Sequence, residues 1–466
     1  MEMAGKQVNP RGKRYTMDMC HGPLFKEIVL FTLPLVGSLY LQITFNTADL
    51  IVLGRFASEG DLAAVGATTS LTNLLLNLCL GLSTGASVVV GQYFGAKQMD
   101  RVSRTTHTAM LLSVVAGTII GILGIFISQP MLLRMKTPLE ILPKSVLYMR
   151  ICFAGMPFKM IYAYGSAILR ATGDTMRPLV FLGIAGVANL LMNLFFVICC
   201  HMDVDGVGLA TIISHAISAI LVLWALSVTH EIGGLHFRKL RLDASIIKRI
   251  LWIGIPIGLQ GISFNLANII IQSSINTFGA LALSGNTAAL TIEYYLSNCS
   301  AGVQSTAISF TAQNLGGRQY RRLKRSFLYC CIISCTAVMA MAGVAMLFGR
   351  ELLSIFTRNE EVIDWGQLRM NIMFSTYALG CIMNVMTGTM RGLGRSMTAF
   401  AIVFAFACVF RILWVMFVFP SHRTYPMLIT VFPLSWLLIV VATGIYLFFV
   451  FRRFPKDNEP WAGNKL

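Results

Sequence analysis

A single carboxylate interrupts a long apolar stretch near the start of the chain. Residues 25–55 are mostly Leu, Ile, Val, Phe and small residues. A stripe within them has members at i, i+3, i+4 and i+7, which are Gln42, Phe45, Asn46 and Asp49. On a helix, this spacing places the side chains on one face. A carboxylate among apolar neighbours is costly to ionise, so the pattern predicts a group that binds and releases a proton or a cation during transport.

The depth of Asp49 in a membrane is not fixed by counting residues. Lys26 is expected near one membrane surface, and the 23 residues from it to Asp49 span roughly 35 Å on a straight helix. The hydrocarbon core is about 30 Å thick, so Asp49 is either a functional group inside the membrane or an interfacial residue paired with Arg55. Pro34 and Gly37 can bend the helix, and both alternatives therefore stay open.

The composition is that of a protein that crosses a membrane many times. Of the 466 residues, 56% are hydrophobic and only 12% are charged, whereas a soluble protein of this size needs more charge to cover its surface. The net charge of +17 does not indicate nucleic-acid binding, because the basic residues cluster in short loops. The eleven cysteines include no CxxC pair. We interpret them as packing residues, without a disulfide framework or a metal site.

Twelve apolar windows are long enough to span a membrane. An even number of spans places both termini on one side, and the loops of that side hold most of the lysines and arginines. The positive-inside rule then predicts that both termini are cytoplasmic. The predicted fold is an all-α polytopic membrane protein with 12 transmembrane helices. The windows lie at about 26–52, 61–84, 104–128, 143–167, 177–199, 206–229, 248–272, 280–305, 326–349, 365–388, 397–420 and 428–451.

Two sequence segments occur twice in the chain, and the same number of residues separates the two copies in both cases. This number is the separation between Gln92 and Gln313. GQYFGAKQMDR at 91–101 returns as AQNLGGRQYRR at 312–322, and SAILRATGDTM at 166–176 returns as TGTMRGLGRSM at 387–397. We call this spacing the repeat offset. Two halves with the same topology are expected to be related by an axis along the membrane normal, with a binding site between them.

The repeat divides the chain into two lobes. The predicted parts are a tail (1–25), an N-lobe (26–229), a linker (230–247), a C-lobe (248–451) and a second tail (452–466). The basic linker is either a partly amphipathic segment on anionic headgroups or a solvated loop.

Four segments together carry a family resemblance: FNTADLIVLGRF, GLSTGASVVVGQYFGA, SAILRATGDTMRP and TGTMRGLGRSM. The chain resembles the multidrug and toxic compound extrusion (MATE) family, and more closely its bacterial DinF-like branch, from about residue 20 to 450. The resemblance implies a monomeric, multi-pass antiporter of the bacterial cytoplasmic membrane, and not an enzyme. It implies export of organic, often cationic, amphipathic small molecules in exchange for H⁺ or Na⁺. Membrane lipids are the other expected partners, and neither nucleic acid nor a further cofactor is expected.

The resemblance also assigns coupling residues, which we expect to include Asn46. The coupling carboxylate of the family falls on Asp49. Its partners fall on Asn189 and Asn193 of the fifth predicted helix (177–199), and a hydroxyl falls on Thr211 of the sixth (206–229). Proton-coupled relatives are similar in having a second carboxylate where this chain has Asn193, so a relay between two carboxylates is excluded and coupling rests on Asp49. Sodium-coupled relatives carry their acid on the helix matching 248–272, which has none here. This difference favours protons, with a sodium ion near Asp49 as the alternative.

A substrate cavity is predicted to include Gln42 and Phe45 together with residues of the second half. Helix 248–272 repeats the stripe with Gln260, Phe264, Asn268 and Gln272, but Ile271 stands near the place that answers to Asp49. Glu293 lies within window 280–305 beside Tyr294 and Tyr295. This acid either attracts a cationic substrate, helped by the aromatic rings, or forms a structural pair with Arg369 or Arg411.

Other functions are less well supported by the motifs. The sequence has no GxxxxGK[ST], HExxH or GxSxG, which argues against ATP hydrolysis, an intramembrane protease and a lipase. The alternative that we keep is a flippase for lipid-linked intermediates. A flippase would need a cavity lined by several basic residues for phosphates, whereas the deep groups singled out here are acidic.

Overall fold

The computed structural model describes residues 17–56, 59–135, 137–229 and 234–461, which contain helices and no β-strand. The first half comprises α1 (Leu24–Phe56), α2 (Glu59–Gly95), α3 (Met99–Arg134), α4 (Leu142–Ala154), α5 (Met156–Ala171), α6 (Met176–Leu194), the π-helical turn η1 (Phe195–Cys199) and α7 (Val204–Val228). The second half comprises α8 (Ala244–Ile275), α9 (Ala280–Gly316), α10 (Tyr320–Leu347), α11 (Gly349–Ser354), α12 (Glu360–Ser375), α13 (Tyr377–Gly392), α14 (Ser396–Val403), the π-helical turn η5 (Phe404–Val409), α15 (Phe410–Leu413), the π-helical turn η6 (Trp414–Val418), α16 (Tyr425–Ile429) and α17 (Val431–Arg452). The described residues also contain three short 3₁₀ turns: η3 (Phe237–Lys239), η4 (Asn276–Phe278) and η7 (Phe419–Ser421).

Nine candidate membrane spans are present within the described residues, by length and apolarity. The other three expected windows fall on α9, on α4 with α5, and on α12 with α13. Each of the last two windows was expected to form one helix, but the structure divides it into two. The first of these windows is divided at Gly155, where α4 ends, and the second at Thr376, where α12 ends. These breaks are related by the repeat offset, and Pro157 accounts for the first by starting α5. The protein is an all-α polytopic membrane protein, and the total of twelve spans stays a prediction.

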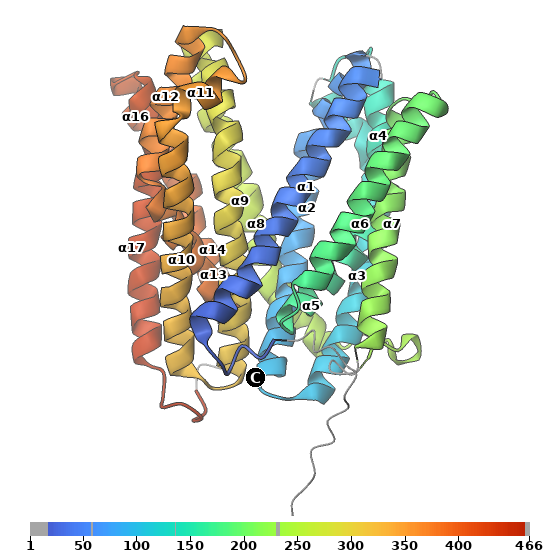
Figure 1. The fold of residues 1–466 in the computed structure, drawn as a ribbon, viewed down its shortest axis with the longest axis vertical. Helices are drawn as coiled ribbons and strands as arrows, with labels where there is room; N and C mark the ends of the chain where they lie inside the picture. Colours follow the sequence, from blue (N-terminus) through green and yellow to red (C-terminus); the bar gives the residue numbers. More distant parts are fainter. Residues whose placement is uncertain (1–16, 57–58, 136, 230–233, 462–466) are drawn as a thin grey trace, which may run out of the picture.

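Figure 1 shows two bundles of helices that approach each other at the end where the carboxyl terminus lies and diverge toward the other end. We call the end where the bundles approach each other the basic end. It includes loops 96–98, 172–175, 317–319 and 393–395. Between the bundles, α2 packs against α8 through two glycines on each helix. A Cβ on Gly81 would lie 2.4 Å from the Gly258 nitrogen, and one on Gly85 would lie 3.0 Å from the Gly254 nitrogen. Four-residue spacing of small residues lets membrane helices approach this closely.

Helix α1 runs from the second bundle to the first (Figure 1). Its beginning packs against α9, where Phe31 and Phe310 stack edge to face with ring centroids 5.7 Å apart. Its end is buried against the first bundle, where Leu53 shares a core with Val197 and Val207. The crossing brings the later half of α1 to α6.

Two glutamines of the repeat tie the bundles together at the basic end. The Gln92 side-chain amide on α2 donates a hydrogen bond to the Gly392 carbonyl at the end of α13 (2.9 Å). The Gln313 amide on α9 donates to the Ala171 carbonyl at the end of α5 (2.7 Å). The two donors are related by the repeat offset, and so are the two acceptors. We call this symmetric pair of bonds the glutamine clasp.

Two glycines make the glutamine clasp possible. A Cβ on Gly95 would lie 1.9 Å from the Gln313 carbonyl oxygen, and a Cβ on Gly316 would lie 1.9 Å from the Gln92 carbonyl oxygen. No side chain fits at either place, so α2 and α9 cross in direct backbone contact.

The segment before α1 lies across the glutamine clasp. Met19 is fully buried, and its N–H donates to Gln313 Oε1 (3.3 Å). Arg322 donates to the Met19 carbonyl (2.8 Å) and pairs with Glu27 (2.7 Å). This segment therefore covers the contact between the bundles.

The linker is held against α3 in its described part, 234–243, and residues 230–233 lie outside the described residues. The His236 N–H donates to His107 Nε2 (3.0 Å), and the Thr108 hydroxyl donates to the Arg241 carbonyl (3.0 Å). Asp243 caps α8 by accepting from the N–H of Ser245 (2.9 Å), which is why this helix begins a few residues before the expected position 248.

Candidate functional site

Asp49 lies at the contact between α1 and α6. The Asn193 amide donates a hydrogen bond to Asp49 Oδ1 (2.6 Å) and is 3.3 Å from Asn189 Oδ1. Asn189 and Asn193 are 5% and 0% exposed, and Asp49 is partly buried. No ion pair joins Asp49 to Arg55 in the described part of the chain. The structure therefore brings together three of the predicted coupling residues.

The Asn193 side chain has one unused hydrogen-bonding atom. Its Oδ1 is buried, and no partner for it exists among the described residues. Because a carboxamide both donates and accepts, Asn193 can donate to an ionised Asp49 and, after the amide turns over, accept from a protonated one. The three residues also offer oxygens of the kind that bind a sodium ion.

The other predicted coupling residues stand apart from this contact. The Thr211 hydroxyl donates to the Val207 carbonyl of its own helix (2.9 Å). Asn46 is exposed. Phe45 packs over Gly186 of α6, where a Cβ would overlap its ring at 1.8 Å. Phe45, which was predicted to line the substrate cavity, is therefore packed against α6 and only partly buried.

The predicted cavity residues of the second half divide into buried and exposed ones. Gln260 is buried and accepts a hydrogen bond from Arg391 (3.0 Å). Asn268 is exposed, as is Tyr294 at 63%, and Gln42 of α1 is exposed as well. Gln260 is therefore bonded to a neighbouring helix, whereas Asn268, Tyr294 and Gln42 have accessible side chains.

Glu293 forms the structural pair that was one of its two expected roles. The Arg369 guanidinium lies 2.8 Å from Glu293 Oε2 and also donates to Asn286 Oδ1 (2.9 Å). Tyr425 donates to the same Asn286 oxygen (3.0 Å). The negative charge of Glu293 is therefore matched within its own bundle.

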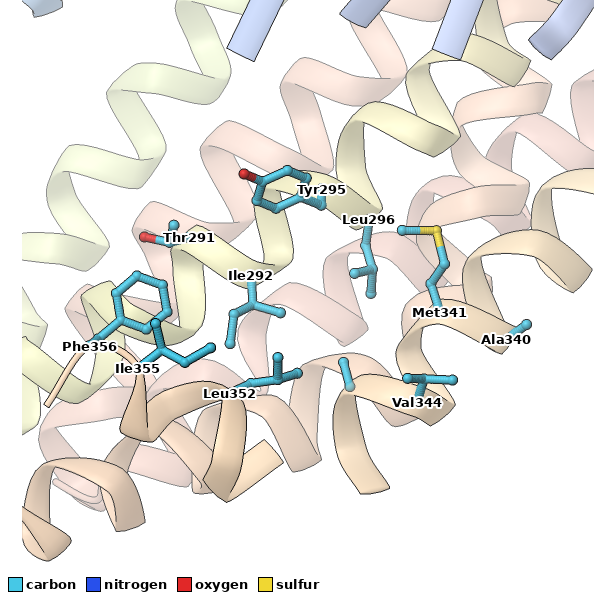
Figure 2. Close-up of a pocket in the computed structure, with 11 residues that line it drawn as sticks. Thr291, Ile292, Tyr295, Leu296, Ala340, Met341, Val344, Leu352, Ile355 and Phe356 are labelled. Atoms are coloured by element: carbon cyan, nitrogen blue, oxygen red, sulfur yellow. The ribbon is translucent and has the colours of Figure 1, made fainter. Parts of the chain in front are cut away.

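An apolar pocket that sequence reasoning missed lies between α9, α10 and α11. Its volume is about 560 Å³, and Figure 2 shows side chains of these helices pointing into it. No motif could have found it, because three helices supply its residues and hardly any of them is polar. The residues include Tyr295, Leu296, Met341, Val344, Leu352 and Phe356.

The comparisons with known proteins agree with this architecture. A family model described as MatE matches residues 34–195 and again residues 256–416. The probable multidrug resistance protein YoeA of Bacillus subtilis is 24% identical over 381 residues, covering 80% of this chain and 82% of the relative. The DNA damage-inducible protein F of Escherichia coli is 21% identical over 71% of this chain and 72% of its own.

A solved structure supports the same fold. It is described as the outward-facing conformation of a multidrug resistance MATE family transporter, and it aligns with a TM-score of 0.86 and 20% identity over 93% of this chain and 97% of that one. The family model covers more than half of the chain, in two matches that coincide with its repeat. The chain therefore belongs to the MatE family and is a multi-pass membrane transporter that exports small molecules, not an enzyme.

Proposed function

We propose that this protein is an antiporter that exports organic, often cationic, drugs or metabolites in exchange for protons bound at Asp49. The observation that carries the proposal is the contact of a carboxylate on α1 with the buried Asn193 of α6. A carboxylate held between two membrane helices changes their contact when it gains a proton, because the hydrogen bond it accepts must be rearranged.

Helix α1 contacts both bundles, so a change in its contact with α6 can alter how the two bundles are arranged. The beginning of α1 is held by α9 through Phe31, and its end is held in the first bundle around Leu53. Pro34 lies after the first contact and removes a backbone hydrogen bond there. A proton on Asp49 is proposed to shift the later half of α1, and the two bundles then alternate in exposing the binding site to each side.

The orientation in the membrane is proposed on the same basis as the sequence prediction. The Lys- and Arg-rich loops belong to the basic end, which we place in the cytoplasm of a bacterial cell, with the protein in the cytoplasmic membrane. The protein is proposed to work as a monomer surrounded by lipid.

The proposal is tested with purified protein in liposomes whose interior is acidic. Ethidium, added outside, should accumulate inside as protons leave. Asp49→Asn is expected to reduce this accumulation more than about tenfold, because the amide cannot carry a proton. Asp100→Asn is a matched control for the same chemical change, since Asp100 is an exposed residue in the first turn of α3, next to loop 96–98 at the basic end, and it should transport as the wild type does.

Two results would count against parts of the proposal. Wild-type accumulation by Asp49→Asn would remove Asp49 from the coupling mechanism. Accumulation driven by a sodium gradient, and not by a pH gradient, would leave Asp49 in place but make the sodium ion the coupling ion.

A further inference from the structure

One buried arginine of the C-lobe is held by a serine and by aromatic rings. Arg411 on α15 is 2% exposed. Its Nε donates to Ser435 Oγ (2.9 Å), and its guanidinium carbon lies 4.5 Å from the centroid of the Phe432 ring and 5.9 Å from that of Phe264. Within the described residues no carboxylate forms an ion pair with it. A buried charge without a directly bonded counter-charge is costly, so this arginine calls for an explanation.

No acid of the C-lobe bonds directly to Arg411 within the described residues. Between residues 248 and 451 the sequence has five carboxylates, and the four between residues 351 and 364 are exposed. The fifth, Glu293, is paired with Arg369 and attracts Arg411 only through space. Arg391 is also buried, at 9% exposure, and donates to the neutral Gln260. The interior of the C-lobe therefore holds more positive than negative charge.

The helix that carries Arg411 is irregular on both sides of it. The π-helical turns η5 and η6 precede and follow the four residues of α15. Residues 396–419 contain no Pro or Gly that would break the helix. π-Helical turns are rare in proteins and are frequent at functional sites.

The position of Arg411 also corresponds to the coupling contact of the N-lobe. Subtracting the repeat offset from Arg411 gives Leu190, which lies between Asn189 and Asn193 on α6. The same offset relates the two α17 neighbours of Arg411 to residues of α7, pairing Phe432 with Thr211 and Ser435 with Ser214.

We propose that Arg411, between Phe264 and Phe432, is a subsite for the anionic group of an exported aromatic molecule. A guanidinium binds carboxylate or phosphate oxygens through two parallel hydrogen bonds, and the phenyl rings offer faces for an aromatic body. Phe264 is partly buried and lies one turn before the exposed Asn268 on α8, so the subsite borders an exposed stretch of that helix. The proposal rests on the export function above and names one class of cargo for it.

The test uses two probes that share an aromatic body and differ in charge. 2-Naphthoate and 2-naphthylmethylammonium are titrated into the purified full-length protein in phosphatidylcholine nanodiscs, and binding is measured by calorimetry. We expect the wild type to bind the carboxylate about tenfold more tightly than the ammonium ion. Arg411→Gln should abolish this preference, and Arg411→Lys should keep part of it because the charge remains.

Arg423→Gln is the matched control, because Arg423 is an exposed arginine of the same half; it should bind both probes as the wild type does. Size-exclusion chromatography of each variant shows that it is folded, and Phe432→Leu, which keeps all charges, should weaken both probes. The proposal is overturned if the wild type binds both probes equally or if Arg411→Gln binds the carboxylate like the wild type.

A third arm identifies the source of the anionic group. If phosphatidylglycerol in the nanodiscs displaces naphthoate, and does so only when Arg411 is present, the occupant is a lipid headgroup and the assignment to an exported solute is wrong. Binding in nanodiscs needs no ion gradient, so failure of proton-coupled ethidium transport does not affect this test.

Discussion

The N-lobe and the C-lobe place residues of opposite charge in corresponding regions, although not at corresponding positions. On α1 and α6, Asp49 accepts a hydrogen bond from the buried Asn193. In the C-lobe segment that the repeat offset relates to α6, Arg411 is held by Ser435 and lies against Phe432. The two regions lie on related segments and differ in the sign of their charged residue, so the repeat preserves the order of the helices and not their chemistry.

The basic end shows the opposite behaviour. Gln92 and Gln313 make equivalent hydrogen bonds to equivalent carbonyls, and Gly95 and Gly316 allow equivalent backbone contacts. Closure of this end needs both bundles to contribute in the same way, so symmetry is kept where the bundles meet. The comparison can be tested at both kinds of position.

The largest effect is expected from valine at the glycines beneath the glutamine clasp. Gly95→Val and Gly316→Val each force α2 away from α9, because the new Cβ overlaps a carbonyl oxygen. Each should cost more than about 5 kcal/mol of unfolding free energy, because an overlap with a backbone oxygen cannot be relieved by moving a side chain. Each should also expose Cys20, which is buried beside Gln313, to a maleimide whose attachment is located by mass spectrometry.

Gly343→Ala provides the control for these variants, since no atom lies within 4 Å of the place where its Cβ would be. Labelling of Cys20 should not change in this variant. A large difference between Gly95→Val and Gly316→Val would contradict the equivalence of the two lobes at this end.

The next effect concerns an ion pair that only the C-lobe has. The repeat offset relates Glu293 and Arg369 to Thr72 and Tyr148 of the N-lobe. Glu293→Gln or Arg369→Met leaves a buried charge without its partner, which should lower the unfolding free energy by about 3–5 kcal/mol. The double variant should be more stable than either single variant, as measured by denaturant unfolding in detergent.

The exposed pair Lys144 with Asp203 (2.9 Å) is the control in the N-lobe. Asp203→Asn should cost less than about 1 kcal/mol, because solvent already screens the pair. If Glu293→Gln were as mild as this change, the ion pair would not be what stabilises the C-lobe interior.

The smallest expected effect is a difference in unfolding free energy between variants of the two clasp glutamines. Gln313→Leu removes the bond to the Ala171 carbonyl and the neutral, longer bond from the Met19 N–H (3.3 Å), and it should cost about 1 kcal/mol, whereas Gln92→Leu should cost about 2 kcal/mol. The difference arises because Gln92 Oε1 also accepts a hydrogen bond from the charged Arg249 (2.6 Å). The leucine variant leaves Arg249 without this acceptor. Thermal unfolding monitored by tryptophan fluorescence measures both. Gln98→Leu, an exposed glutamine of the same end, should behave as the wild type.

Much of the fold could be predicted from the sequence, because apolar windows and a repeat are properties of single segments. The contact of Asp49 with Asn193 was also anticipated, through the family resemblance, and its role in coupling stays a prediction. What could not be predicted depends on neighbours across helices. Periodicity left two partners open for Glu293, and only packing selects Arg369. The glutamine clasp ends on backbone carbonyls, which every residue has and no motif marks.

The glutamine clasp also limits how the basic end can open. Since the repeat offset relates its two hydrogen bonds, a movement that separates the bundles symmetrically lengthens both by the same amount. In such a movement neither bond persists while the other breaks. Release at this end should therefore be all-or-none, and single molecules should show two distances across it without a half-released intermediate.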